Sequence, residues 1–194
     1  MLKIETQTKP LLAVGPMSPE IVEAVFYFSN FYREPLMLIA SKNQVDHAGG
    51  YVNGWTTREY MKFVNEMRQL YLFAEIKICR DHCGPGFNGN FDIKDVYRTI
   101  KTDIQNGFDL IHIDFCKHKG SNAEKLAESK KAILHCLKLN PNIELEIGTD
   151  ENIGTNFGAM NLQEVEREIN FFVQFCKPEF YVVQTGSLIK EINQ

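Results

Sequence analysis

Residues 76–85 read Ile-Lys-Ile-Cys-Arg-Asp-His-Cys-Gly-Pro, a short β-branched run that ends in an acid and an imidazole side by side. Similar aliphatic runs recur along the chain, and polar residues follow them before segments with helical periodicity. Strands and helices that alternate in this way form a parallel sheet with right-handed crossovers. The C-terminal ends of parallel strands meet at one mouth, where barrel enzymes place their chemistry. Asp81 and His82 are therefore predicted to be site residues.

The expected strands are aliphatic runs bounded by turn residues. They cover residues 11–15, 36–40, 76–81, 110–115, 143–147 and 180–183. A complete TIM barrel has eight strands and about 250 residues. Six strand-helix units therefore predict a single α/β domain over residues 1–194, a (β/α) barrel of TIM type that lacks its last two strands. An open doubly wound sheet is the alternative, but the turn at residues 15–18 lacks the spaced glycines of a dinucleotide site.

Capping residues indicate where the helices begin. Ser18-Pro19 is a typical helix start, and the three-to-four spacing of Ile21, Val25, Phe28 and Tyr32 predicts the apolar face of that first helix. Two further helix starts have the spacing of a capping box: Thr56 with Glu59, and Ser121 with Glu124.

Composition narrows the function classes. The chain has 194 residues, of which 44% are hydrophobic, and 21 basic against 25 acidic residues give a net charge of -4. Without a basic block, nucleic acid is not an expected partner. No apolar run approaches the roughly 20 residues of a membrane span, and no signal peptide is recognisable, so we expect a cytoplasmic protein outside the membrane. The five scattered cysteines are predicted to be free thiols.

Motifs at successive strand ends resemble one known family. They are Asn43-Gln44-Val45 with Gly49-Gly50-Tyr51, Asp81-His82-Cys83-Gly84-Pro85, Ile111-His112-Ile113-Asp114, Ile147-Gly148-Thr149-Asp150 and Val182-Val183-Gln184-Thr185-Gly186. Together, over residues 11–187, they look like the non-catalytic (Z-type) subunit of class II tagatose-bisphosphate aldolase. This chain departs from the family at Lys42, where a small hydroxyl residue is usual, at Asp150, which replaces a Glu, and at Thr185, which replaces a Pro.

The resemblance implies a (β/α)8 barrel related to class II ketose-bisphosphate aldolases, which cleave a sugar bisphosphate with a divalent metal. The function that the resemblance implies first is that of an accessory subunit of a class II tagatose-1,6-bisphosphate aldolase, in sugar-phosphate metabolism. Such a subunit would bind a catalytic subunit or a second copy of itself. One alternative is a metal-dependent class II aldolase that performs retro-aldol cleavage of a ketose phosphate. The other is a sugar isomerase or epimerase barrel, and whether the chain is itself an enzyme is left open.

Site residues follow from the same resemblance. In active relatives an Asp-His pair shuttles a proton and holds zinc, so Asp81 is the candidate catalytic group and His82 a candidate metal ligand. Glu146 resembles a further acidic group near the metal and is the second candidate ligand. A catalytic zinc takes three protein ligands, and Gln184 stands where metal-dependent relatives carry a histidine, so zinc is a possible cofactor with an incomplete ligand set. The candidate substrate-binding residues are Asn43, Gln44, Asp114, Gln184 and Gly186.

Structural roles compete with these assignments. The acid-imidazole pair could serve only to bond loop amides. Glu144 and Glu146 share one face of an expected buried strand, so at least one should meet a cation, which a covering helix could supply. His112 points the same way as Asp114 but lies deeper in its strand, and is interpreted as a core histidine. Asp46-His47, in a glycine-rich loop, could contact substrate, although exposed loop histidines often have no role.

Overall fold

The structure is a computed structural model that describes residues 11–149 and 162–184. Its strands are β1 (Leu12–Val14), β2 (Leu36–Ser41), β3 (Ile76–Cys83), β4 (Leu110–Ile113), β5 (Glu144–Thr149) and β6 (Phe180–Val183). Its helices are α1 (Pro19–Tyr32), α2 (Thr57–Leu70), α3 (Ile93–Asn106), α4 (Asn122–Leu139) and α5 (Leu162–Phe172). None of the described helices is long and apolar enough to cross a membrane.

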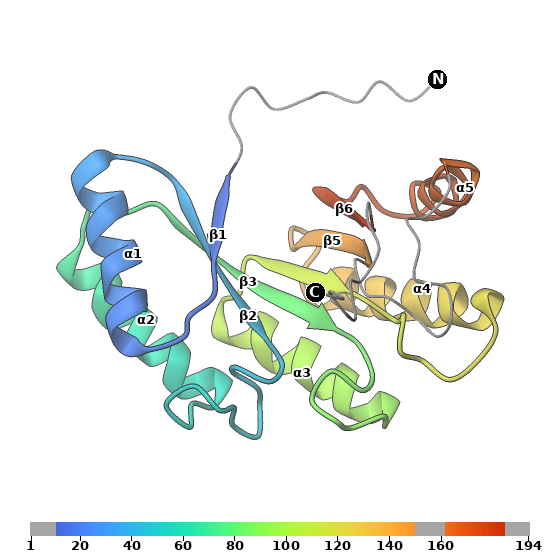
Figure 1. The fold of residues 1–194 in the computed structure, drawn as a ribbon, viewed down its shortest axis with the longest axis horizontal. Helices are drawn as coiled ribbons and strands as arrows, with labels where there is room; N and C mark the ends of the chain where they lie inside the picture. Colours follow the sequence, from blue (N-terminus) through green and yellow to red (C-terminus); the bar gives the residue numbers. More distant parts are fainter. Residues whose placement is uncertain (1–10, 150–161, 185–194) are drawn as a thin grey trace, which may run out of the picture.

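The six strands form one parallel sheet in chain order, β1-β2-β3-β4-β5-β6. Figure 1 shows the sheet curling, with the helices along its outer side. The predicted alternation and parallel α/β fold are therefore confirmed. Among the described residues β1 and β6 each pair along one edge, so these residues form a half-barrel, and a closed TIM barrel stays a prediction.

Helices begin where the capping residues predicted. The Ser18 hydroxyl accepts a hydrogen bond from a backbone N–H in the first turn of α1. Both predicted capping boxes form, with reciprocal side-chain to backbone bonds at the starts of α2 and α4. Caps of this kind contribute about 1 kcal/mol each, because they satisfy N–H groups that the helix itself leaves unpaired.

The predicted apolar face of α1 is right for Val25, which is buried, but the rest of the buried stripe is displaced by one position. Val22 and Phe26 are fully buried beside Val25, whereas Phe28 and Tyr32 are 44% and 57% exposed. Apolar residues occupy most positions of this helix, so two neighbouring stripes fit a helical period equally well. Packing against the sheet, rather than periodicity, decides which stripe is buried.

The two faces of the sheet have different contents. Alternate side chains on the outer face join the main hydrophobic core beneath the helices. The inner face holds a smaller apolar cluster around Met37, Cys79 and Leu110. All five cysteines are free thiols, as predicted, and Cys79 is buried in this inner cluster.

Ionised groups share the inner face with this cluster. Glu144 of β5 forms an ion pair with Lys77 of β3, which confirms that one of the two neighbouring glutamates meets a cation. For Glu144 the cation comes from a strand of the same sheet and not from a covering helix. Glu146, one layer nearer the C-terminal end of β5, lies opposite His112 of β4 in the strand register.

Candidate functional site

Four acidic and imidazole side chains meet at the C-terminal ends of β3 and β4. Asp81 and His82 come from the end of β3, and His112 and Asp114 come from the end of β4 and the residue just beyond it. The Nδ1 atom of His82 lies 2.9 Å from an Asp114 carboxylate oxygen, and Nδ1 of His112 lies 3.2 Å from an Asp81 oxygen. The mouth cluster, as we call these four residues, therefore consists of two acid-imidazole pairs.

A β-bulge brings the two pairs together. Three steps along β3, from Arg80 to Cys83, face only two steps along β4, from Ile111 to Ile113. Within the bulge His82 has a left-handed φ of 47°, a conformation that costs a side-chain-bearing residue roughly 1–2 kcal/mol. Bulges beside active sites re-aim side chains in this manner. Here the backbone N–H of His82 comes within 3.2 Å of the His112 ring.

Mutual pairing sets the charge state of the mouth cluster. Burial disfavours the ionised form of each carboxyl, but the bond from His112 lowers the pKa of Asp81 and the bond from His82 lowers the pKa of Asp114. Burial also favours neutral His112, but its bond to Asp81 and the nearby charge of Asp114 outweigh burial and raise its pKa to about 9. Both carboxylates are thus ionised at neutral pH, and the imidazole of His112 is protonated and positively charged.

The mouth cluster has the donor types of a divalent metal site. His82 is held by Asp114 through Nδ1, and Nε2 of His112 lies 3.0 Å from the carbonyl oxygen of Gly148. Proteins orient metal-binding imidazoles by holding the other ring nitrogen in this way. Ligand atoms of Asp81, His82 and His112 all lie within 4.8 Å of one another. Two imidazoles and a carboxylate fit zinc, and binding would displace the proton from His112.

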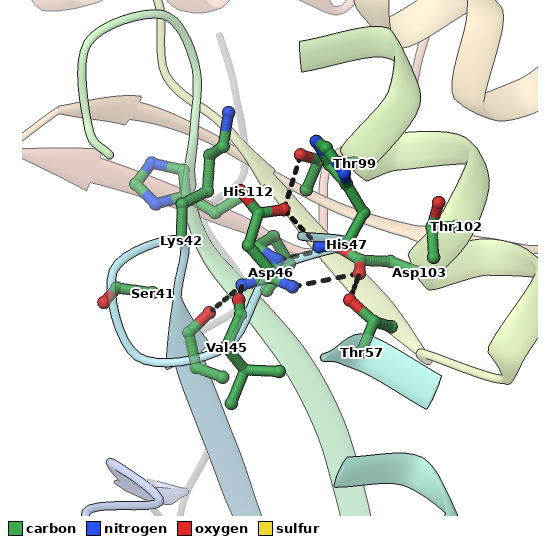
Figure 2. A network of polar contacts seen from close by, with 12 residues as sticks. Ser41, Lys42, Val45, Asp46, His47, Thr57, Thr99, Thr102, Asp103 and His112 are labelled. Atoms are coloured by element: carbon green, nitrogen blue, oxygen red, sulfur yellow. Dashed lines mark hydrogen bonds and ion pairs between the residues drawn. The ribbon is translucent and has the colours of Figure 1, made fainter. Parts of the chain in front are cut away.

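Buried charges lie behind the mouth, where the loops after β2 and β3 meet α3 (Figure 2). Asp95 receives the ammonium of Lys42 at 2.8 Å and Nε2 of His47 at 2.7 Å. The Asn88 amide donates to both Asp46 and Asp95, at 2.9 and 3.0 Å. Ligand atoms of Asp46, His47 and Asp95 also lie close together, but their oxygens are already occupied by these donors. This group is therefore a structural network.

Arg80 forms the centre of a second buried network on the same side of β3. Its guanidinium makes a bidentate pair with Asp103 of α3, at 2.6 and 2.9 Å. Its third nitrogen, Nη1, donates to the carbonyl oxygens of Ala40 and Val45, at 3.0 and 2.6 Å. These two carbonyls lie on either side of the turn at residues 41–44. Arg80 therefore fixes the turn after β2 at the mouth.

Comparisons with known proteins identify the family of this chain. The model of the family described as D-tagatose-1,6-bisphosphate aldolase subunit GatZ/KbaZ-like matches residues 3–136, which is more than half of the chain. The chain belongs to this GatZ/KbaZ-like family.

Solved structures share the fold at low sequence identity. A structure described as a probable tagatose 6 phosphate kinase from Sinorhizobium meliloti 1021 has a TM-score of 0.69 at 18% identity, over 84% of this chain and 43% of its own. The fructose-bisphosphate aldolase of Campylobacter jejuni has a TM-score of 0.66 at 15% identity, over 90% of this chain and 52% of its own. The GatZ/KbaZ-like chain thus spans about half the length of these proteins, and the likeness shows the fold alone.

Sequence reasoning missed the place of His112 in the mouth cluster. The prediction of a core histidine is right about burial, since the residue is 1% exposed. The prediction that His112 does not reach the mouth is wrong, because the bulge in β3 brings Asp81 and His82 into contact with the His112 ring. The two-residue spacing from Asp114 puts both side chains on one face of β4, but that spacing alone does not reveal the bulge in β3 that brings Asp81 to His112.

The other predicted site residues do not belong to the mouth cluster. Glu146 is half-buried on β5 and is not among the three residues whose ligand atoms gather most closely. Asn43 is exposed in the turn after β2, and the side-chain oxygen of Gln44 accepts the N–H of Ser41 at 2.8 Å. Gln184 is buried just after β6. Gly186, Asp150 and Thr185 lie outside the described residues.

The position of Asp46-His47 corrects the expectation of an exposed loop. Asp46 is 2% exposed, and its carboxylate accepts the Thr99 hydroxyl of α3 at 2.8 Å. His47 is half-buried against Asp95. The glycine-rich loop folds inward because α3 offers polar partners that no local sequence pattern reveals.

Asp95 should give the protein a measurable acid sensitivity. Burial alone would raise its pKa, but the hydrogen bonds from Lys42, His47 and Asn88 hold it at about 2, against about 3.9 for an unfolded chain. This stabilisation is complete above about pH 5 and is lost progressively as the pH falls toward 2. We expect Asp95 to account for a loss of about 1 kcal/mol in unfolding free energy between pH 6 and pH 3.

Urea unfolding at the two pH values measures this loss. The variant Asp95→Asn should lose that part of the pH dependence, whereas Glu66→Gln, at an exposed position of α2, should keep it. An Asp95→Asn protein with the same pH dependence as the parent chain would contradict the assignment.

Proposed function

We propose that this chain is an accessory, non-catalytic-type subunit of a class II tagatose-1,6-bisphosphate aldolase and binds a separate catalytic subunit. Membership of the GatZ/KbaZ-like aldolase subunit family carries the proposal. In this role the protein works in cytoplasmic sugar-phosphate metabolism. A second copy of the chain is the other partner that the proposal admits.

The polar residues at the mouth support an accessory role. Metal-dependent relatives use a histidine where this chain has Gln184, and an amide is a poor zinc ligand. Nε2 of His82 and Nδ1 of His112 remain the imidazole nitrogens that the mouth cluster offers, with His112 protonated until a metal displaces its proton. Such a site binds metal less tightly than one with a third imidazole, so chemistry is assigned to the partner.

A metal-dependent aldolase is the second candidate function, and the gathering of Asp81, His82 and His112 favours it. These three residues would hold a divalent ion, which would supply a Lewis acid for the ketose carbonyl. The ionised Asp81 would accept the proton of the hydroxyl next to the breaking carbon–carbon bond. Asn43, Gln44, Asp114, Gln184 and Gly186 are proposed to orient the sugar phosphate, and Glu146 to assist as a further metal ligand.

An activity assay separates these functions. A catalytic tagatose-bisphosphate aldolase subunit is assayed for cleavage of tagatose 1,6-bisphosphate, alone and with an equimolar amount of this chain. The proposal predicts that the two proteins co-purify, that the mixture is more active than the catalytic subunit alone, and that this chain alone cleaves nothing.

Other outcomes would overturn the accessory role. Cleavage by this chain alone with bound zinc, lost in Asp81→Asn and kept in the control Glu66→Gln, would establish the second candidate. Interconversion of a sugar phosphate without cleavage would point to an isomerase or epimerase. No co-purification and no stimulation would count against any accessory role.

A further inference from the structure

An aromatic ring from the glycine-rich loop after β3 lies flat on the His82 imidazole. The ring centroids of Phe87 and His82 are 4.6 Å apart, and their planes differ by 13°. Phe87 is buried, and the ammonium of Lys117, from the loop after β4, lies 4.0 Å from its ring centroid. One strand residue and two loop residues are thus stacked at the mouth, with Phe87 between His82 and Lys117.

His82 needs such support because its backbone is strained. Its left-handed φ of 47° is unfavourable for a residue with a side chain. The Asp114 bond fixes one nitrogen of the ring, at 2.9 Å, but a single bond leaves the ring free to tilt about it. A flat neighbour at stacking distance restricts that tilt. The Nε2 atom then stays on the side of Asp81, 3.8 Å from its carboxylate.

The loop after β3 is built to deliver Phe87 to this place. Gly84 lets the loop approach β4 closely, because a Cβ there would lie 1.5 Å from the carbonyl oxygen of Asp114. Gly86 has a φ of +81° and turns the chain back, and Phe91 packs against it. The close approach at Gly84 and the turn at Gly86 place the Phe87 ring beside the β4 end that carries Asp114.

We propose that Phe87 is a positioning residue for His82. The Phe87 ring lies between Lys117 and His82 and holds the imidazole of His82 with Nε2 directed toward Asp81 and His112. The part of this inference that concerns metal affinity rests on the proposed metal-binding function of the mouth cluster. The stacking itself does not, and is measured in the metal-free protein.

The test compares Phe87→Leu with a matched control on the same loop. Leucine keeps the buried apolar volume but has no flat ring, whereas Phe87→Tyr keeps the ring. The control is Phe91→Leu, because Phe91 is half-exposed and lies against Lys119. Circular dichroism and thermal unfolding verify that each variant folds.

Two readouts follow. In proton NMR of the metal-free chain, the His82 ring protons should resonate upfield because of the Phe87 ring current. This shift should vanish in Phe87→Leu and persist in Phe87→Tyr and Phe91→Leu. In zinc titration, Phe87→Leu should bind about tenfold more weakly, and the other two variants should bind like the parent chain.

The NMR and zinc-binding measurements can each contradict the proposal independently. An unchanged His82 ring shift in folded Phe87→Leu would overturn the positioning role. Equal zinc affinities for Phe87→Leu and the parent chain would overturn it as well. If the parent chain binds no zinc while the ring shift behaves as expected, positioning stands and the metal-binding proposal falls.

Discussion

Replacement of Arg80 by leucine is expected to lower the free energy of unfolding by about 3–5 kcal/mol. Arg80 and Asp103 are both fully buried, and leucine leaves the Asp103 carboxylate without its bidentate partner. Only the Thr57 hydroxyl, at 3.0 Å, would still donate to it among the bonds described. The carbonyl oxygens of Ala40 and Val45 would lose a donor in the same step.

Urea denaturation of the single and double variants measures this effect. The double variant Arg80→Leu with Asp103→Leu removes both charges and should recover a large part of the loss, because an apolar pair replaces an ion pair. A single-variant loss below about 1 kcal/mol would instead mean that water reaches this network and solvates Asp103.

Replacement of Gly84 by alanine is expected to destabilise the chain by about 3 kcal/mol, at the upper end of overpacking effects. The added Cβ would lie 1.5 Å from the Asp114 carbonyl oxygen. That oxygen belongs to the backbone beyond β4, so no side-chain rotation relieves the clash. The loop must move away from β4, and this movement also disturbs the stacking of Phe87 on His82.

Gly89 provides the matched control in the same loop. It has a φ of +80° with nothing within 4 Å of an added Cβ, so Gly89→Ala should cost only the left-handed strain of about 1 kcal/mol. Thermal unfolding of both variants checks the difference. Equal losses for the two alanine variants would show that the contact between the loop and β4 is not close.

Local signals in the sequence were sufficient for the element order. Capping boxes and Ser18 predicted helix starts because these residues satisfy backbone donors within one turn, without reference to the rest of the fold. The apolar face of α1 was beyond such signals, because most of its positions are apolar. There the sheet decides which side is buried.

The candidate site was predictable only in part. Asp81, His82 and Asp114 follow from the convergence of parallel strand ends. His112 enters the mouth cluster through a bulge in the neighbouring strand, for which residues 76–85 give no distinct signal. The partners of Arg80 and Lys42 lie on α3, 23 and 53 residues away, and no short-range pattern encodes pairings at that separation.

The proposal that this chain is an aldolase subunit is tested most directly by its physical association with a catalytic partner. Analytical ultracentrifugation of this chain mixed with a catalytic tagatose-bisphosphate aldolase subunit should show one faster-sedimenting complex that contains both proteins. Independent sedimentation of the two proteins at every mixing ratio would contradict the account.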